Sequence, residues 1–229
     1  MDEKAASGGA WPCILGGSAR PVGCAVSFIE VPAEAILDAV RELRGAAIRV
    51  STRMDLLGCL SALDPMQAPW TKEAIIDCGD WTAYVNNGIN GGDLTAIAPA
   101  LAREHGWRCI GAQNMPRYGP GHAACQLWIQ DPTGPPPLHI VRTISAYAQD
   151  GRWSWHESGD PQPFEDPDRY TARRIRDRLD RALLVRYLES LGIRPDDPSF
   201  FGEGVVATQM VSWASREDPV EGFRQANNW

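Results

Sequence analysis

The strongest constraint on the fold is a run of short apolar segments between residues 107 and 156, separated by turn-forming residues. Within 123–130, apolar side chains alternate with polar ones, which is the period of a half-buried β-strand. Asp150-Gly151, between the strand-like segments 138–148 and 152–156, is a strong signal for a tight hairpin. Strands joined by tight turns pair antiparallel. The sequence therefore predicts a central antiparallel sheet.

Other segments have the apolar period of strands or helices. We expect further strands at 24–29, 47–50, 74–78, 81–85 and 205–213, and helices at 32–45, 54–63 and between Asp93 and Gly106. The longest predicted helix begins at Asp166-Pro167 and continues to Leu191, before Gly192. The predicted fold class is α+β, with a mainly antiparallel central sheet and this long C-terminal helix packed on one face.

A break at Asp64-Pro65 to Pro69 suggests how the chain is divided. We predict that residues 1–65 form an N-terminal arm and a small βαβα unit, either separate or part of the same domain. Residues 66–229 then form the main α+β domain. A chain of 229 residues buries enough surface on folding to be stable without disulfides or a structural metal.

The charge of the chain restricts its partners. The formal net charge is −7 at pH 7. A surface of this sign repels phosphate backbones, so we expect no general nucleic-acid binding. It attracts basic proteins and accelerates encounter with them.

Cysteine usage and the first residues bear on the compartment. The six cysteines are scattered, and no Cys-x-x-Cys pair occurs. Reduced core thiols of a cytosolic protein are the interpretation we favour. Residues 1–10 are acidic and small where a secretory signal is basic and then apolar. No apolar run reaches the roughly 20 residues of a membrane-spanning helix. We therefore predict a cytoplasmic protein without membrane association.

Catalytic and metal-binding motifs give little support to an enzyme. The sequence lacks the nucleophile elbow, the P-loop and the dinucleotide fingerprint, and no two histidines lie three or four residues apart. We expect no metal and no cofactor. If the protein is an enzyme, the candidates are His122 and His139, which begin adjacent predicted strands, with Asp131 and Arg142, in acid–base work on a small polar substrate. Arg142 also requires a carboxylate partner if its strand face is buried.

Tryptophan is unusually frequent, with nine residues in the chain. Trp128 lies between Gln126 and Gln130, on the polar face of its strand, where a core role explains it poorly. Two others share a strand face just before an acidic loop, and aromatic anchors beside an acidic rim are typical of a surface for a basic partner. The alternative is that these rings pack beneath the long helix. The predicted partner-binding residues are Trp128, Trp153, Trp155, Glu157, Asp160 and Glu165.

Several short stretches carry a resemblance to other proteins. They are Trp81-Thr82-Ala83-Tyr84 with Asn87-Gly88 and Gly92-Asp93, Val141-Arg142-Thr143-Ile144-Ser145 with Gly151-Arg152-Trp153, and Gly159 with Pro163-Phe164-Glu165. In these the chain resembles uncharacterised acidic proteins of high-GC bacteria. In its acidic, Trp-rich and motif-free character it is similar to immunity proteins of polymorphic toxin systems. Neither resemblance implies particular functional residues.

These observations favour a non-enzymatic, protein-binding inhibitor of immunity type that neutralises a basic partner through an acidic, Trp-containing surface. Two alternatives stay open at this point. One is a small-molecule enzyme with dispersed His, Asp and Arg residues, and the other is a structural or assembly subunit of a bacterial complex.

Overall fold

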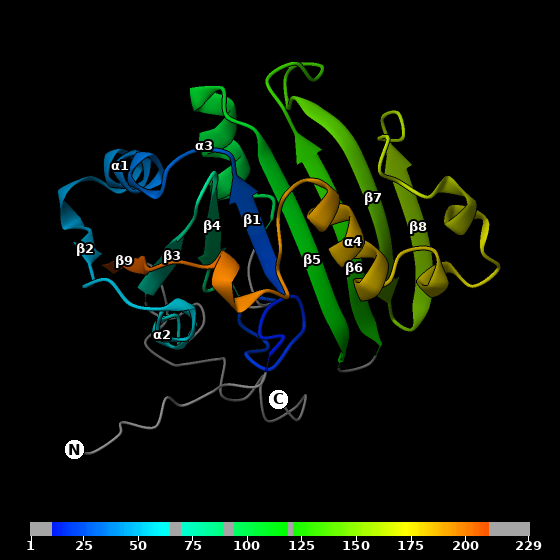
Figure 1. Cartoon of the computed structure of the whole chain (residues 1–229), viewed down its shortest axis with the longest axis horizontal. Coiled ribbons are helices and arrows are strands. Elements are labelled where there is room, and N and C mark those ends of the chain that lie inside the picture. Colours follow the sequence, from blue (N-terminus) through cyan, green and yellow to red (C-terminus); the bar gives the residue numbers. More distant parts are fainter. Residues whose placement is uncertain (1–10, 65–69, 89–93, 119–120, 211–229) are drawn as a thin grey trace.

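The computed structural model describes residues 11–64, 70–88, 94–118 and 121–210. Within these residues nine strands form one sheet in the order β2-β9-β3-β4-β1-β5-β6-β7-β8, and all neighbours pair antiparallel (Figure 1). The strands are β1 (Ala25–Ile29), β2 (Arg49–Val50), β3 (Trp70–Cys78), β4 (Trp81–Asn86), β5 (Cys109–Tyr118), β6 (His122–Gln130), β7 (Ile140–Gln149), β8 (Arg152–Ser158) and β9 (Gly204–Met210).

Short helices cover both sides of this sheet. The α-helices are α1 (Ala33–Arg44), α2 (Leu56–Ala62), α3 (Ile97–His105) and α4 (Arg181–Ser190). Single 3₁₀ turns are η1 (Gly45–Ala47), η2 (Pro167–Thr171), η3 (Ile175–Asp177) and η4 (Pro198–Phe200). The described helices do not include one that combines the length and the apolar character needed to cross a membrane.

The two faces of the sheet bury two separate apolar cores. On the first, called the α4 face, Leu127 and Ile144 pack with residues of α2, α4 and the segment 11–24. Figure 1 shows α4 lying in front of the sheet on this side. On the second, called the α3 face, Ile29 and Cys109 pack with apolar residues of α1 and α3. Alternation along each strand supplies apolar side chains to both cores.

The predicted fold class is wrong, because the long C-terminal helix does not form. η2, η3 and α4 occupy the range where one helix was expected, and the longest α-helix described is α1, with 12 residues. The apolar period of 175–191 is real, but local polar bonds interrupt the helix. The Arg178 Nε donates to the Ala172 carbonyl, and Asp180 begins α4 by accepting from the Leu183 N–H at 2.9 Å. The protein is consequently mostly sheet.

The hairpin predicted at Asp150-Gly151 is confirmed. Both residues have positive φ, 50° and 77°, and Gln149 pairs with Arg152 across the turn. These angles suit a two-residue turn whose twist matches that of its strands. β1 lies between β4 and β5, so the N-terminal strand belongs to the middle of the same sheet.

We predict that Asp180→Ala lowers the free energy of unfolding by about 1 kcal/mol, because the first turn of α4 loses its capping acceptor. Urea denaturation followed by circular dichroism measures this change. The control is Asp177→Ala, since Asp177 is exposed to a similar degree and, within the described part of the chain, has an ion pair only with Arg176 at 3.7 Å. Equal losses in the two variants would contradict the capping role.

Candidate functional site

β8 is a terminal strand of the sheet and has seven residues. Its register with β7 starts from the closing pair Gln149 and Arg152. In a two-residue hairpin the closing pair exchanges hydrogen bonds, and bonded and non-bonded pairs then alternate. The N–H and C=O groups of Trp153, Trp155 and Glu157 therefore point away from β7. Among the described residues, no other strand pairs with this outer side.

The side chains of these same residues lie on the α4 face. Trp153 and Trp155 are half-buried and pack against the core on that side. The Trp155 ring lies 5.0 Å from the Tyr170 ring, and the Arg178 guanidinium is 5.9 Å from the Trp155 ring centre. Both tryptophans thus have one ring region in the core and one near the surface, which is the usual arrangement of an amphipathic anchor.

Arg142 is a buried charged side chain near β8, with 1% of its side chain exposed. Its Nε and Nη2 donate to the two Glu165 oxygens at 2.9 and 2.8 Å, and Nη2 also donates to Glu157 at 2.9 Å. Its Nη1 donates to the Gly159 carbonyl at 2.7 Å. The carboxylate partner expected for a buried Arg142 is therefore present.

Tyrosines complete this network around Glu165. The Tyr170 hydroxyl donates to Glu165 at 2.8 Å and lies 3.0 Å from the Tyr187 hydroxyl. Burial raises the pKa of Tyr170, and the bonds to Tyr187 and Glu165 add to the rise. Burial alone would lower the pKa of Arg142, but the bonds to Glu165 and Glu157 raise it above its usual value. Arg142 and Tyr170 therefore both keep their protons at neutral pH and act with Glu165 as a structural anchor.

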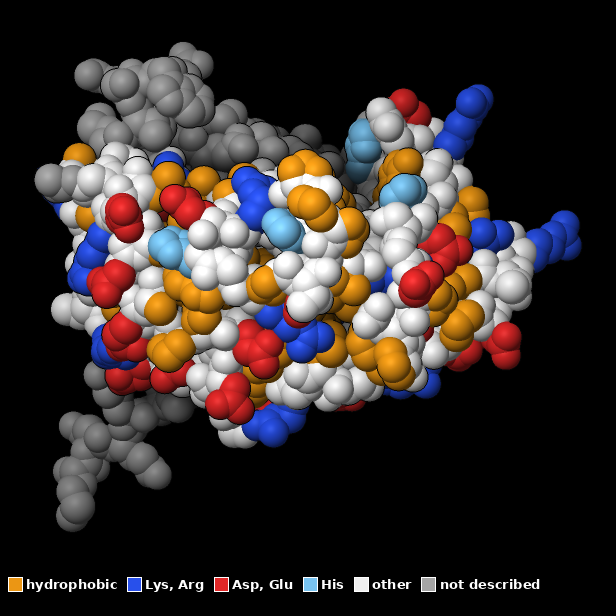
Figure 2. Space-filling view, turned by 90° about the horizontal axis from the view of Figure 1, so that it is seen from above, with side chains coloured by type: hydrophobic (Ala, Val, Ile, Leu, Met, Phe, Trp, Pro, Cys, Tyr) orange, Lys and Arg blue, Asp and Glu red, His pale blue; other side chains and the backbone are white. Residues whose placement is uncertain are grey.

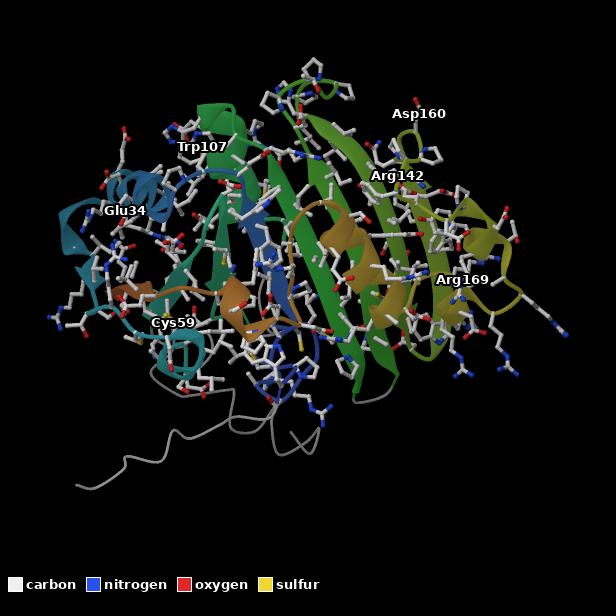
Figure 3. The ribbon with its side chains drawn as sticks, in the orientation of Figure 1. Glu34, Cys59, Trp107, Arg142, Asp160 and Arg169 are labelled. Carbon is white, nitrogen blue, oxygen red and sulfur yellow. The ribbon has the colours of Figure 1, made fainter. Side chains whose placement is uncertain are left out.

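Gly159 allows the chain to turn tightly where this network begins. It has a φ of 75°, and a Cβ at this position would lie 1.9 Å from the Val141 carbonyl oxygen. Only glycine fits such a close approach of two backbones. The turn leads into the segment whose Glu165 binds the Arg142 guanidinium. Figure 3 shows Asp160 in the loop above Arg142.

The predicted acidic residues divide between the surface and the interior. Glu165 has a fully buried side chain, whereas Glu157 is 42% exposed and Asp160 is exposed. Asp168 is also exposed in this region. Figure 2 shows acidic and arginine side chains intermixed at this end of the molecule, with hydrophobic side chains between them. The exposed acids in and after β8 are therefore Glu157, Asp160 and Asp168, whereas Glu165 binds Arg142 in the interior.

Trp128 lies on the other side of the sheet from Trp153 and Trp155. It pairs with Thr143 across β6 and β7, and Thr143 pairs with Ser158. This row faces α3, whereas Trp153 and Trp155 face α4. The six predicted partner-binding residues thus do not form one surface.

The dispersed catalytic residues are not brought together. Because β6 and β7 are antiparallel, His122 lies beside the end of β7, while His139 lies beside the end of β6. The strand between these positions spans on the order of 25 Å. Arg142 is bound to Glu165 on the α4 face. The expected meeting of His122 and His139 does not occur.

Asp131 and His139 are neighbours, but each closes a local turn. The Asp131 carboxylate accepts from the hydroxyl and the N–H of Thr133 at 2.6 and 2.9 Å, and the hydroxyl bond contributes most to its lowered pKa. The His139 Nδ1–H donates to the Gly134 carbonyl at 3.0 Å, and its C=O accepts from the Asp131 N–H. These contacts shape the loop between β6 and β7.

The six cysteines are all free and buried. Burial raises the pKa of each, for example to about 11 for Cys13 and about 12 for Cys109. Within the described residues, no cluster of His, Cys, Asp and Glu has the arrangement of a metal site. These thiols are therefore core side chains that stay protonated at neutral pH.

Comparison with protein-family models, curated proteins and solved structures found no match. Function must accordingly be argued from the geometry of this chain.

Sequence reasoning identified Arg142 as a residue needing a partner but did not identify the partner. Several acids follow β8 in the chain, and only the turn at Gly159 places Glu165 against the guanidinium. The roles of Tyr170 and Tyr187 were missed, since both were expected in one continuous helix. The one sequence signal for an irregular segment around Glu165 was the presence of Pro161, Pro163 and Pro167, which restrict φ and lack a backbone N–H donor.

We predict that Arg142→Met lowers the free energy of unfolding by about 3–5 kcal/mol, because Glu165 stays buried without its cation. Chemical denaturation measures the loss. The double variant Arg142→Met with Glu165→Met is expected to lose less than the sum of the single losses. Arg176→Ala, at an exposed ion pair, is the control and is expected to change stability by less than about 1 kcal/mol. Additive losses in the double variant would show that the ion pair is not a coupled unit.

We also predict a stability loss at alkaline pH from the buried thiols. An unfolded thiol loses its proton near pH 9.0, whereas folded Cys109 keeps it to about pH 12. Between these values the unfolded state binds fewer protons, so stability is full below about pH 9 and falls as the pH rises. Denaturation at about pH 8 and about pH 10 in wild type and Cys109→Ala measures this. The variant is expected to show the smaller decrease, and an equal decrease would contradict the prediction.

Proposed function

We propose that this protein works by binding another protein, as an immunity-type inhibitor that neutralises a basic partner at the β8 edge. The observation that carries the proposal is the outer side of β8, with which no other strand of the described residues pairs. Three successive outward positions, Trp153, Trp155 and Glu157, present backbone donors and acceptors there. An exposed strand of this length is a template for pairing with another chain.

Strand addition explains why backbone and side chains are arranged together at this edge. In this binding mode main-chain hydrogen bonds supply affinity, and side chains next to the edge supply specificity. Trp153 and Trp155 provide half-buried aromatic area beside the outward backbone groups. Such rings are the residue type that most often carries binding energy in protein interfaces.

The charge distribution favours a basic segment as the occupant. Exposed Glu157 lies in the C-terminal part of β8, and exposed Asp160 and Asp168 follow β8 in the chain. The whole chain carries −7. Complementary charge increases the association rate and determines which partners are excluded. Arg169, which follows Asp168, is paired with Asp180 at 3.3 Å. The partner is inhibited when this protein covers the basic surface through which the partner contacts its own target.

The test uses two substitutions at one position. Glu157→Pro removes an outward N–H without removing a backbone bond to β7, and Glu157→Gln keeps that N–H. Both variants lose the carboxylate that accepts from Arg142, so a difference between them isolates the N–H. With tagged protein as bait in an extract of its native cells, wild type is expected to capture one basic protein in near-equal amount. We expect Glu157→Gln to reduce this capture several-fold, in a salt-dependent way, and Glu157→Pro to abolish it.

Folding and toxicity controls make the outcomes decisive. Each variant must keep the wild-type thermal transition, and Trp153→Lys, which places a repelling charge at the edge, serves as a second blocking variant. Expressed alone, the captured protein is expected to inhibit growth, and co-expression with the wild type is expected to relieve that inhibition. Unchanged capture by folded Glu157→Pro and Trp153→Lys variants would exclude the β8 edge. Capture of a non-toxic protein would exclude the immunity role.

A further inference from the structure

A cavity of about 210 Å³ lies on the α3 face, on the opposite side of the sheet from Trp153 and Trp155. α3 forms one wall, β5 and β6 form the floor, and Leu138 and Ile140 close the side next to β7. The lining is mainly apolar. Leu138 is one of the few large apolar side chains exposed in the described residues, at 52%. An apolar hollow with few polar groups is the usual form of a small-molecule site.

Gly111 provides the depth of this cavity. It lies directly opposite Trp128 across β5 and β6. A Cβ at position 111 would be 3.5 Å from the Trp128 Cβ and 3.6 Å from Leu94 Cδ2, which is ordinary contact distance. A strand residue without a side chain often marks a place where another group approaches closely. Here a larger side chain would occupy the cavity without straining the backbone.

Trp128 is held in place as part of the wall. Its Nε1–H donates to Gln126 Oε1 at 3.0 Å, so its one polar atom is satisfied outside the apolar core. The Gln130 Nε2 donates to the Pro99 carbonyl at 3.0 Å and ties β6 to α3. This position explains an aromatic residue on the polar face of a strand. The ring belongs to a cavity wall.

Arg103 gives the cavity its charge. It is exposed, it is the one charged side chain among the residues lining this cavity, and no ion pair of the described residues involves it. It also lines an adjoining hollow of about 100 Å³. Asp131 in that hollow already accepts from Thr133 and pairs with Arg108 at 3.7 Å. Cys109 contributes no charge, because burial raises its pKa to about 12.

We propose that this cavity binds a small aromatic carboxylate, with its ring against Trp128 and its carboxylate paired with Arg103. The volume sets the size, since a cavity of ~150 Å³ already holds benzene. The space of about 210 Å³ therefore accepts one ring and a short acidic group. A guanidinium selects a carboxylate through paired charge-assisted hydrogen bonds. This site shares no residue with the β8 edge, so its failure and that of the proposed inhibitor function are distinguishable.

The experiment titrates the full chain with phenylacetate and with its neutral analogue phenylacetamide. Methyl chemical shifts of Leu94, Leu138 and Ile140 report occupancy of the cavity, and calorimetry gives the dissociation constants. Wild type is expected to bind phenylacetate with saturable shifts at these three residues. We expect phenylacetamide to bind about tenfold more weakly or worse, since it lacks the charge that Arg103 selects.

Three substitutions identify the contributions of charge and space. Arg103→Gln is expected to weaken phenylacetate about tenfold and to leave phenylacetamide within about twofold. Gly111→Val is expected to abolish binding of both by filling the cavity, and Gly111→Ala, which adds one methyl at contact distance, serves if the valine variant does not fold. The matched control is Arg186→Gln, which changes an exposed arginine on α4 and is expected to have no effect.

Each remaining outcome would overturn the proposal. Equal binding of the acid and the amide would remove the role of Arg103. No saturable shift up to about 10 mM would exclude this ligand class. Loss of capture of the protein partner in Gly111→Val, without any binding of phenylacetate to wild type, would assign the cavity to a partner side chain.

Discussion

The buried ion pair between Arg142 and Glu165 determines how the chain after β8 is arranged. An uncompensated charge at this depth costs several kcal/mol, so the guanidinium must have its carboxylate in every molecule that folds. Meeting that requirement brings the segment 159–166 back over β7 and places Tyr170 against Trp155. The segment lies on the α4 face as a result, and β8 remains the last strand of the sheet.

A second buried carboxylate supports the same principle elsewhere in the sheet. Glu73 on β3, with 2% of its side chain exposed, accepts from Arg44 at 2.7 Å and from the Tyr84 hydroxyl at 2.7 Å. Both carboxylates are therefore bound by one arginine and one tyrosine, on opposite faces of the sheet. A slip of one residue in register would reverse which face each charge points to. Because apolar cores cover both faces of the sheet, its apolar residues alone allow more than one strand register. These two ion pairs thus specify the register.

Local patterns predicted local structure well, and failed where the outcome depended on contacts between distant segments. Asp150-Gly151 is a residue pair typical of a two-residue hairpin turn, and that turn forms. Trp128 was recognised from the sequence as a residue that a core role explains poorly. The helical period of residues 175–191 predicted one helix, but bonds at Ala172 and Asp180 divide it. His122 and His139 were expected to meet because both begin strands. Antiparallel pairing puts the beginnings of neighbouring strands at opposite ends, and this excludes the predicted catalytic cluster.

The openness of the β8 edge is the claim on which the functional account depends, and amide hydrogen exchange measures it residue by residue. In the free protein, the account predicts fast exchange at Trp153, Trp155 and Glu157 and slow exchange at Ser154 and His156, whose N–H groups face β7. On addition of the captured partner, the three fast amides are predicted to become protected. Slow exchange at the three outward amides in the free protein, or no protection in the complex, would contradict the account.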